Sequence, residues 1–244
     1  MIYSLIMKKF ILLVFFSFTI NSYSQSYLVT YDMDQLAKEI NLKTNIKTYL
    51  KGNNKNSVYI EDFMNAFSES PDNVFSIKAK QNPIYFKELG KKTITYNDHI
   101  RLKFFDIKDS ISSYNWTLHN ESKKILNYNC QKATCSFRGR NFTVYFTNEL
   151  PFSDGPWKFF GLPGLILEVN SDDSIATITL IAEKIELKNE NIAVENLYKN
   201  KKIISIDEYI KLYIEQYNKS LSYVVNENGE TRPMSKGFIE YYIN

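Results

Sequence analysis

The sequence predicts an α+β to mostly β fold, in which a curved antiparallel sheet is packed by a C-terminal helix. Two observations support this class. Apolar and polar residues alternate along many short stretches of the chain, as half-buried strands require. Only the stretch at about 205–221 repeats its apolar residues at steps of three and four, which is typical of an amphipathic helix.

Residues 1–24 have the pattern of a secretory signal peptide. Two lysines precede an apolar run from Phe10 to Phe16, and Ser22-Tyr23-Ser24 offers small residues to a signal peptidase. The run is short for a membrane span, which needs about 20 apolar residues, so a retained membrane anchor is the weaker alternative. We expect an exported protein, in the periplasm or at the surface of a bacterium, with a single domain at 25–244 and no transmembrane span in the mature chain.

The remaining 220 residues are ample for one domain with a sizeable core. They carry 28 basic and 27 acidic side chains, which gives a net charge of +1. This balance leaves no electrostatic footprint for nucleic acid or for an anionic membrane surface, so neither is expected as a partner.

Alternation places the strands in chain order. The predicted strands are Tyr27–Tyr31, Val58–Ile60, Ile100–Phe104, Tyr114–Leu118, Ala133–Phe137, Phe142–Phe146, Leu165–Val169 and Ala176–Ala182. Residues 36–50 fit either a helix or a strand, and the stretches 52–56 and 71–73 look like loops.

Three local signals refine this order. Arg138-Gly139-Arg140-Asn141 is a glycine-centred turn that predicts a hairpin between the strands on either side. Ile185 and Leu187 have the opposite parity to the apolar residues before them, so a bulge near 183–184 would return them to the core. Ser205 and Glu208 have the spacing of a capping box at the start of the helix.

Glycine and proline gather at 155–164, directly before the strand at Leu165. Gly161-Leu162-Pro163-Gly164 suits a type II turn, in which Gly164 takes a positive φ after Pro163. We therefore expect the glycines to shape the chain, and Trp157 to lie half-buried beside the arginine hairpin.

The hexapeptide Gly161-Leu162-Pro163-Gly164-Leu165-Ile166 resembles the motif of the GLPGLI family of secreted bacterial proteins. The resemblance extends over about 116–170 and includes Gly155-Pro156-Trp157-Lys158-Phe159 and the arginine turn. Asn127 stands where the family usually has glycine, and Phe146 where it often has tyrosine. The resemblance implies an exported envelope protein, and it implies neither an established activity nor a cofactor.

Candidate binding residues cluster around this motif. Arg138 and Arg140 could form a clamp for an anion or a carboxylate, or a solvated turn, or ion pairs with Asp154 or Glu149. Asp154 and Glu149 could serve as an acid and base pair, although carboxylates beside a turn usually cap it. Trp157 is either a plug over the sheet or a ligand platform.

Catalytic and metal signals are weak. Only two histidines, His99 and His119, are present, and the sequence has no HExxH, GxSxG, CxxC or phosphate loop. We expect no catalytic residues, no metal and no cofactor.

Cys130 and Cys135 leave their pairing open. An oxidising compartment and an even count favour a disulfide. On a continuous strand, however, an offset of five residues puts the two Cα atoms about 16 Å apart, beyond the roughly 7 Å limit for a bridge. Two unpaired thiols are favoured slightly.

The favoured function is a non-catalytic binding or docking protein whose partner is an envelope or outer-membrane protein. The alternative is a carrier that holds a lipid or another hydrophobic ligand in a half-barrel groove. A hydrolase is the second alternative.

Overall fold

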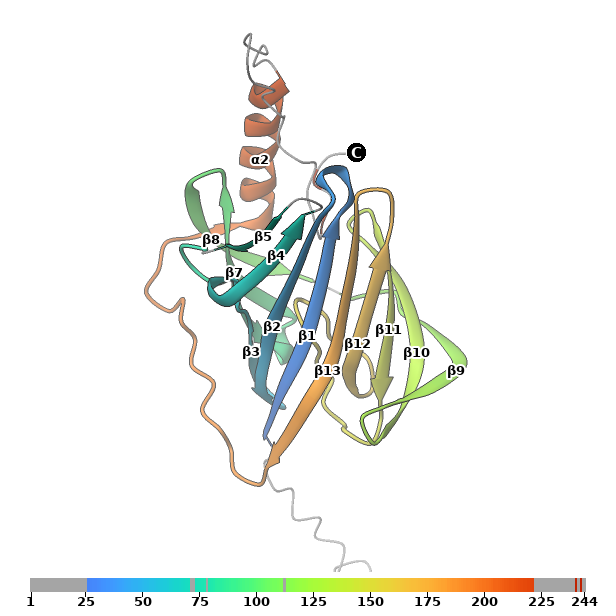
Figure 1. Cartoon of the computed structure of the whole chain (residues 1–244). Helices are drawn as coiled ribbons and strands as arrows, with labels where there is room; N and C mark the ends of the chain where they lie inside the picture. Colours follow the sequence, from blue (N-terminus) through green and yellow to red (C-terminus); the bar gives the residue numbers. More distant parts are fainter. Residues whose placement is uncertain are drawn as a thin grey trace, which may run out of the picture.

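The computed structural model describes residues 26–70, 73–77, 79–111, 113–221, 240 and 242. The predicted signal peptide and part of the predicted loop at 71–73 lie outside these residues. The described chain is mostly β, with one curved sheet and one C-terminal α-helix that packs against it, as the sequence predicts (Figure 1).

Most strands follow one another with short connections, and the longer ones are residues 148–164 and 189–202. Their bounds are β1 Ser26–Ala37, β2 Leu42–Asn53, β3 Asn56–Glu61, β4 Ala66–Ser70, β5 Asn73–Ile77, β6 Ile84–Glu88, β7 Thr93–Ile100, β8 Lys103–Ser110, β9 Thr117–Ile125, β10 Tyr128–Phe137, β11 Arg140–Thr147, β12 Leu165–Asp172, β13 Ala176–Lys188 and β14 Ile203–Ser205. The helix α2 is Ile206–Leu221, and three short 3₁₀ turns are η1 Lys38–Ile40, η2 Phe63–Asn65 and η3 Leu89–Lys91.

The sheet has 14 strands among the described residues, and its main path is β14-β8-β7-β6-β3-β2-β1-β13-β12-β11-β10-β9. Strand β4 pairs with β2 and β5, off this path. The pairs are antiparallel except β14 with β8. Figure 1 shows β1 and β13 side by side at the centre, although the chain between them supplies most of the other strands.

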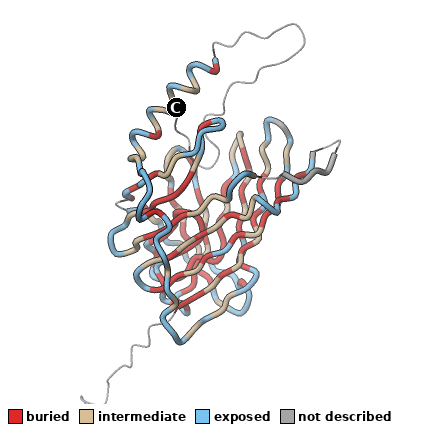
Figure 2. Tube along the Cα trace, turned by 90° about the vertical axis from the view of Figure 1, so that its left-hand side faces the viewer, coloured by how far each residue is buried: buried red, intermediate tan, exposed pale blue. Residues whose placement is uncertain are grey.

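Side chains on the inner face, the face covered by the segment between β11 and β12, form rows that cross neighbouring strands. Tyr59, Tyr85 and Tyr96 stand opposite one another on β3, β6 and β7, and their ring centroids are 5.7 and 5.4 Å apart. Figure 2 shows that buried residues concentrate along the strands, while α2 is buried at few positions. On each of these strands, the residue two positions from the tyrosine lies beside it on the same face of the sheet.

Several local predictions are confirmed. β10 and β11 form the expected hairpin, with positive φ at Arg138 (45°) and Gly139 (80°) in the turn. Glu208 donates its backbone N–H to the Ser205 hydroxyl at 3.1 Å at the start of α2. The register of β13 against β1 skips Glu183, which is the predicted bulge. This bulge returns Ile185 only partly to the core.

Two predicted strands are wrong. Ile100 ends β7 and Lys103 begins β8, so Leu102 lies in the turn with 85% of its surface exposed, because Arg101 takes a positive φ of 55°. Strand β9 begins only at Thr117, and its Leu118 is exposed. The ambiguous stretch 36–50 is largely strand, in β1 and β2.

Gly164 is required for a different reason from the one that its sequence suggests. Its φ is not positive, so the expected type II turn is wrong; Gly161 has the left-handed φ, at 94°. A Cβ at Gly164 would overlap the backbone carbonyl of Thr147. The glycine therefore permits the close approach of two chain segments at the start of β12.

Gly164→Ala is expected to lower the free energy of unfolding by about 1–3 kcal/mol, because the Thr147 backbone cannot move aside freely. Gly90→Ala is the matched control, since a Cβ at Gly90 meets nothing within 4 Å, and its change should stay within about 0.5 kcal/mol. Chemical denaturation of both variants measures the difference. Equal stability of the two variants would contradict the steric reason.

Candidate functional site

The segment between β11 and β12, residues 148–164, packs onto the inner face of the sheet and is called the plug segment here. Trp157 is 4% exposed, so the expectation that it is half-buried is wrong. Its ring packs against Phe142 and Phe159, with centroids 5.9 and 5.1 Å away. Trp157 is thus a structural anchor, although its side chain also borders a cavity described below.

A buried ion pair joins this plug segment to the sheet. The Lys87 Nζ lies 2.5 Å from an Asp154 carboxylate oxygen, and both side chains are almost completely buried. Tyr27 donates its hydroxyl to the other oxygen of Asp154 at 2.6 Å, and Lys87 also donates to the Gly155 carbonyl at 2.5 Å. Burial and the Asp154 charge raise the pKa of Tyr27, so its hydroxyl stays a donor. Burial lowers the pKa of Lys87 against the opposing effect of Asp154.

A second buried network has the opposite polarity. Lys158 of the plug segment lies 2.6 Å from Glu240 and 3.4 Å from Asp109 of β8. Arg138 binds Asp109 with two hydrogen bonds of 2.8 Å and contacts Glu240 at 2.5 Å. Burial disfavours the Asp109 carboxylate, but Lys158 and Arg138 together hold its pKa below its ordinary value.

The sequence-predicted clamp of two arginines does not form. Arg138 binds Asp109 and Glu240, whereas Arg140 pairs with Asp173 at 2.8 Å. The alternative of ion pairing is therefore correct in kind, with partners other than the expected Asp154 and Glu149. The reason is that Arg138 lies in the turn with a positive φ of 45°, whereas Arg140 is the first residue of β11, so the strand rule that puts positions i and i+2 on one face does not apply to them.

Asp154 and Glu149 are likewise not a pair. Asp154 is buried against Lys87, whereas Glu149 is exposed and accepts hydrogen bonds from the backbone and side chain of Asn129 at 2.8 and 3.2 Å. Glu149 thus has the capping role that carboxylates beside turns usually have.

The remaining sequence candidates have structural surroundings. Cys130 and Cys135 are both free and buried on β10, and burial raises the pKa of each thiol, for Cys130 to about 11 and for Cys135 to about 12. His119 shares a 2.8 Å hydrogen bond with the Thr134 hydroxyl. Within the described residues, no group of three or more His, Cys, Asp or Glu side chains is placed to hold a metal ion.

One hollow of the inner face, called the tyrosine cavity here, has a volume of about 640 Å³. It lies between the plug segment, the ends of β3, β6 and β7, and α2. Its tyrosines are Tyr85, Tyr96, Tyr209, Tyr213 and Tyr242. Trp157, Phe63 and Phe104 add further rings, and Glu61, Asp98, Lys158 and Glu240 supply charged groups. A cavity with aromatic walls and a few polar groups is the usual form of a small-molecule site.

The strand register explains why two carboxyl groups meet this cavity. Glu61 follows Tyr59 by two residues on β3, and Asp98 follows Tyr96 by two on β7, so each shares the inner face with its tyrosine. Pro83, whose carbonyl accepts the backbone N–H of Glu61 at 3.1 Å, directly precedes β6, the strand between β3 and β7. The sequence analysis did not select Glu61 or Asp98, although an acidic residue two positions after a strand tyrosine was a signal that could have identified them.

Glu61 is 3% exposed, and its Oε1 accepts no hydrogen bond from the described residues. Burial, and then the charge of Asp98, raise the pKa of Glu61 to about 8. Burial also raises the pKa of Asp98, although the His99 backbone and the Tyr209 hydroxyl stabilise its charged form. Glu61 is therefore mainly protonated at neutral pH, which is unusual for a glutamate.

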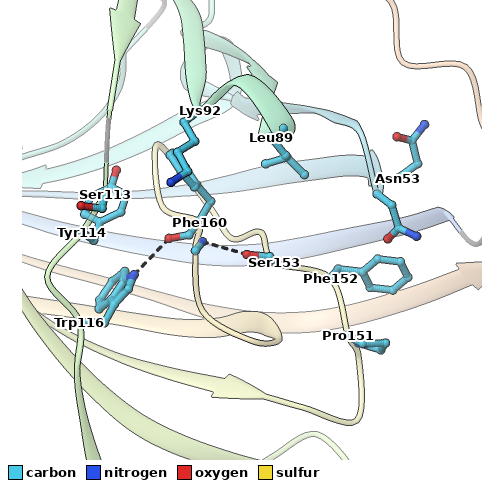
Figure 3. A pocket seen from close by; sticks show the side chains of 13 residues that line it. Asn53, Leu89, Lys92, Ser113, Tyr114, Trp116, Pro151, Phe152, Ser153 and Phe160 are labelled. Atoms are coloured by element: carbon cyan, nitrogen blue, oxygen red, sulfur yellow. Dashed lines mark hydrogen bonds between the residues drawn. The ribbon is translucent and has the colours of Figure 1, made fainter.

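A smaller hollow of about 400 Å³ lies on the other side of the plug segment (Figure 3). Trp116 donates its indole N–H to the Phe160 carbonyl at 3.1 Å, and Gly161 donates its backbone N–H to Ser153 at 3.1 Å. Asn53 and Lys92 border the same hollow. The donors of Trp116 and Gly161 are both bound to the plug segment. This hollow therefore contains fewer unsatisfied buried polar atoms than the tyrosine cavity.

No helix in the described part of the chain is long and apolar enough to cross a membrane.

Comparison with known proteins relates most of this chain to one domain type. Residues 29–210 match the model of the family described as N-glycanase peptide, N-terminal domain. No curated protein matches the chain.

Two crystal structures of PNGF-II, in space groups C2 and P21, are similar with a TM-score of 0.51 in both cases. They are 19% and 17% identical to this chain, of which each covers 79%. This chain covers 32% and 34% of theirs, so it spans about a third of the length of PNGF-II. A DUF1329 family protein from Desulfovibrio piger is more distant, with a TM-score of 0.32, 9% identity, and coverage of 74% of this chain and 91% of that one. At these identities the two PNGF-II structures establish a shared fold.

Lys87→Met is expected to lower the free energy of unfolding by about 3–5 kcal/mol, because Asp154 is left buried without its cation. The double variant Lys87→Met, Asp154→Leu should recover much of this loss, since it buries no charge. Lys219→Met, in the exposed Lys219–Glu215 pair of α2, should change stability by less than about 1 kcal/mol. Urea denaturation of the four proteins measures these values, and a double variant no more stable than Lys87→Met would contradict the coupling.

Glu61 is expected to make the protein less stable as pH rises. Its pKa is raised from 4.5 to about 8 in the folded state, so the folded protein holds a proton that the unfolded chain releases between these values. The penalty is absent below pH 4.5 and complete above pH 8, where it reaches roughly 5 kcal/mol. The free energy of unfolding of Glu61→Gln, relative to that of the parent, should therefore rise between pH 5 and pH 9. Denaturation of both proteins at each pH measures this difference. A difference that stays constant with pH would contradict the shifted pKa.

Proposed function

We propose that this chain, which belongs to the family of the N-glycanase peptide N-terminal domain, is a non-catalytic domain that binds carbohydrate in the tyrosine cavity. The observation that carries the proposal is the cavity itself: about 640 Å³ between rigid strands, with eight aromatic residues and several hydrogen-bonding groups on its walls. Aromatic rings present flat apolar surfaces, against which the C–H faces of sugar rings pack. Gln35 and Gln81 offer amide groups for sugar hydroxyls.

The comparisons support a role that accompanies a glycan-processing enzyme. The family model is named for an N-glycanase, and this chain resembles about a third of PNGF-II. Because a similarity of this extent does not transfer the activity of the whole protein, the proposal is limited to ligand binding.

The two carboxyl groups of the cavity also favour binding over catalysis. An acid and base pair works when its surroundings push the two pKa values apart. Here burial raises the pKa of both Glu61 and Asp98. A shift in the same direction does not mark one group as the acid and the other as the base, so the hydrolase is the weaker candidate.

A hydrophobic ligand is the remaining alternative. The aromatic walls would suit an acyl chain, but a lipid tail offers no partner to the unsatisfied oxygen of Glu61. Export, assignment to the GLPGLI family and docking on an envelope protein remain predictions from the sequence, and they are compatible with carbohydrate binding outside the cytoplasm.

Phe104→Ala is expected to weaken binding of a disaccharide, because Phe104 lines the cavity and is 40% exposed. Calorimetric titration with disaccharides of glucose, of N-acetylglucosamine and of glucosamine should find at least one ligand, with a dissociation constant about tenfold higher in the variant. Phe67→Ala is the control, since Phe67 is 66% exposed and does not line the cavity. If no disaccharide binds, or if both variants bind as the parent does, the proposed function is wrong.

A further inference from the structure

Glu61 is the group in the tyrosine cavity that most clearly lacks a partner. It is 3% exposed, and its Oε1 receives no hydrogen bond from the described residues. The hydroxyl of Tyr96, in the same cavity, is also buried and without a hydrogen-bond partner there. Buried polar atoms are nearly always satisfied, so two such atoms at one cavity indicate that a ligand supplies the missing contacts.

A second carboxyl group faces the same space. The register places Glu61 and Asp98 two strands apart, with Pro83 between them. Two strand spacings separate the backbones by about 10 Å, and proline adds little bulk between them. A small polar group of a ligand can therefore lie between the two carboxyl groups.

Lys158, the buried cation of the cavity, is held by acids other than Glu61 and Asp98. Lys158 is engaged by Glu240 at 2.6 Å and by Asp109 at 3.4 Å. The neighbour of Asp98, His99, lies 3.6 Å from its carboxylate and is positive only when protonated. Lys80 and Arg101 are exposed at the rim. Glu61 is thus buried beside Asp98, whose side chain is 35% exposed, and Lys158 does not neutralise either acid as a direct partner.

The walls are suited to a positive charge as well. The ammonium of Lys158 lies 3.9 Å from the centroid of the Tyr96 ring, which shows that a ring of this cavity accepts a cation on its face. Tyrosine faces and carboxylates together are the groups that bind organic ammonium ions.

We propose that the carbohydrate bound in the tyrosine cavity carries a free amino group, which binds as an ammonium ion between Glu61 and Asp98. This inference rests on the proposed function and names the class of sugar: an amino sugar without its acetyl group. Binding places a positive charge beside Glu61, whose carboxyl proton then passes to the solvent. Tyr59 of β3, Tyr85 of β6, Asp98 of β7 and Lys158 of the plug segment are the titratable groups around Glu61.

The test compares two disaccharides with the same rings. Chitobiose carries two ammonium groups at pH 6, and N,N′-diacetylchitobiose is its neutral counterpart. Titration calorimetry of the full chain at pH 6 should give chitobiose at least about tenfold the affinity of the diacetyl form. Repeating the titration in buffers of different ionisation enthalpy should detect nearly one released proton per bound chitobiose.

Glu61→Gln and Phe104→Ala separate the two proposals. Glu61→Gln keeps the size of the side chain, and it should bring the two affinities within about twofold of each other and abolish proton release. Phe104→Ala should weaken both sugars and preserve their ratio. If the diacetyl form binds as tightly as chitobiose, the inference is wrong and the proposed function stands. If neither sugar binds, the inference is wrong, and the proposed function is wrong too if the disaccharide of glucose also fails to bind.

Discussion

Two buried ion networks of opposite polarity fix the plug segment on the sheet, and the remaining architecture depends on them. The sheet contributes Lys87 to the plug segment's Asp154, and it contributes Asp109 to the plug segment's Lys158. A segment shifted by a few residues would place like charges together or leave a charge unpaired, and either error costs several kcal/mol in a dry interior. The networks thus specify one position for the plug segment, and the aromatic packing of Trp157 and Phe159 follows from that position.

The position of the plug segment also creates the tyrosine cavity. The ammonium group of Lys158 lies over the Tyr96 ring and binds Glu240, so this side chain closes one side of the cavity. It does not form an ion pair with Glu61. The row of Tyr59, Tyr85 and Tyr96 gives this side of the sheet a rigid surface. The acids of the next row are thereby left facing an open space, which is the arrangement on which both proposals depend.

Sequence patterns predicted the fold class, the β10–β11 hairpin, the β13 bulge and the start of α2, because each depends on neighbours along the chain. They failed at Leu102, where alternation continued through a tight turn, and at Gly164, where the reason for glycine is a carbonyl of another segment. The prediction of the site residues failed for the same reason. Arg138 finds Asp109, and Glu61 meets Asp98, only through strand register, which a single stretch of sequence does not contain.

The pairing of β1 with β13 has a consequence for how the chain reaches its folded state. It joins Ser26 to Lys188 and Ala37 to Ala176, so the centre of the sheet combines the start of the described chain with a strand made much later. Contacts between residues so distant in sequence form slowly, because a long loop must close before any of them is gained. During synthesis the hairpins can appear one by one, but the sheet stays divided until residue 188 has left the ribosome. The nascent chain therefore completes its folding only after most of it has been synthesised.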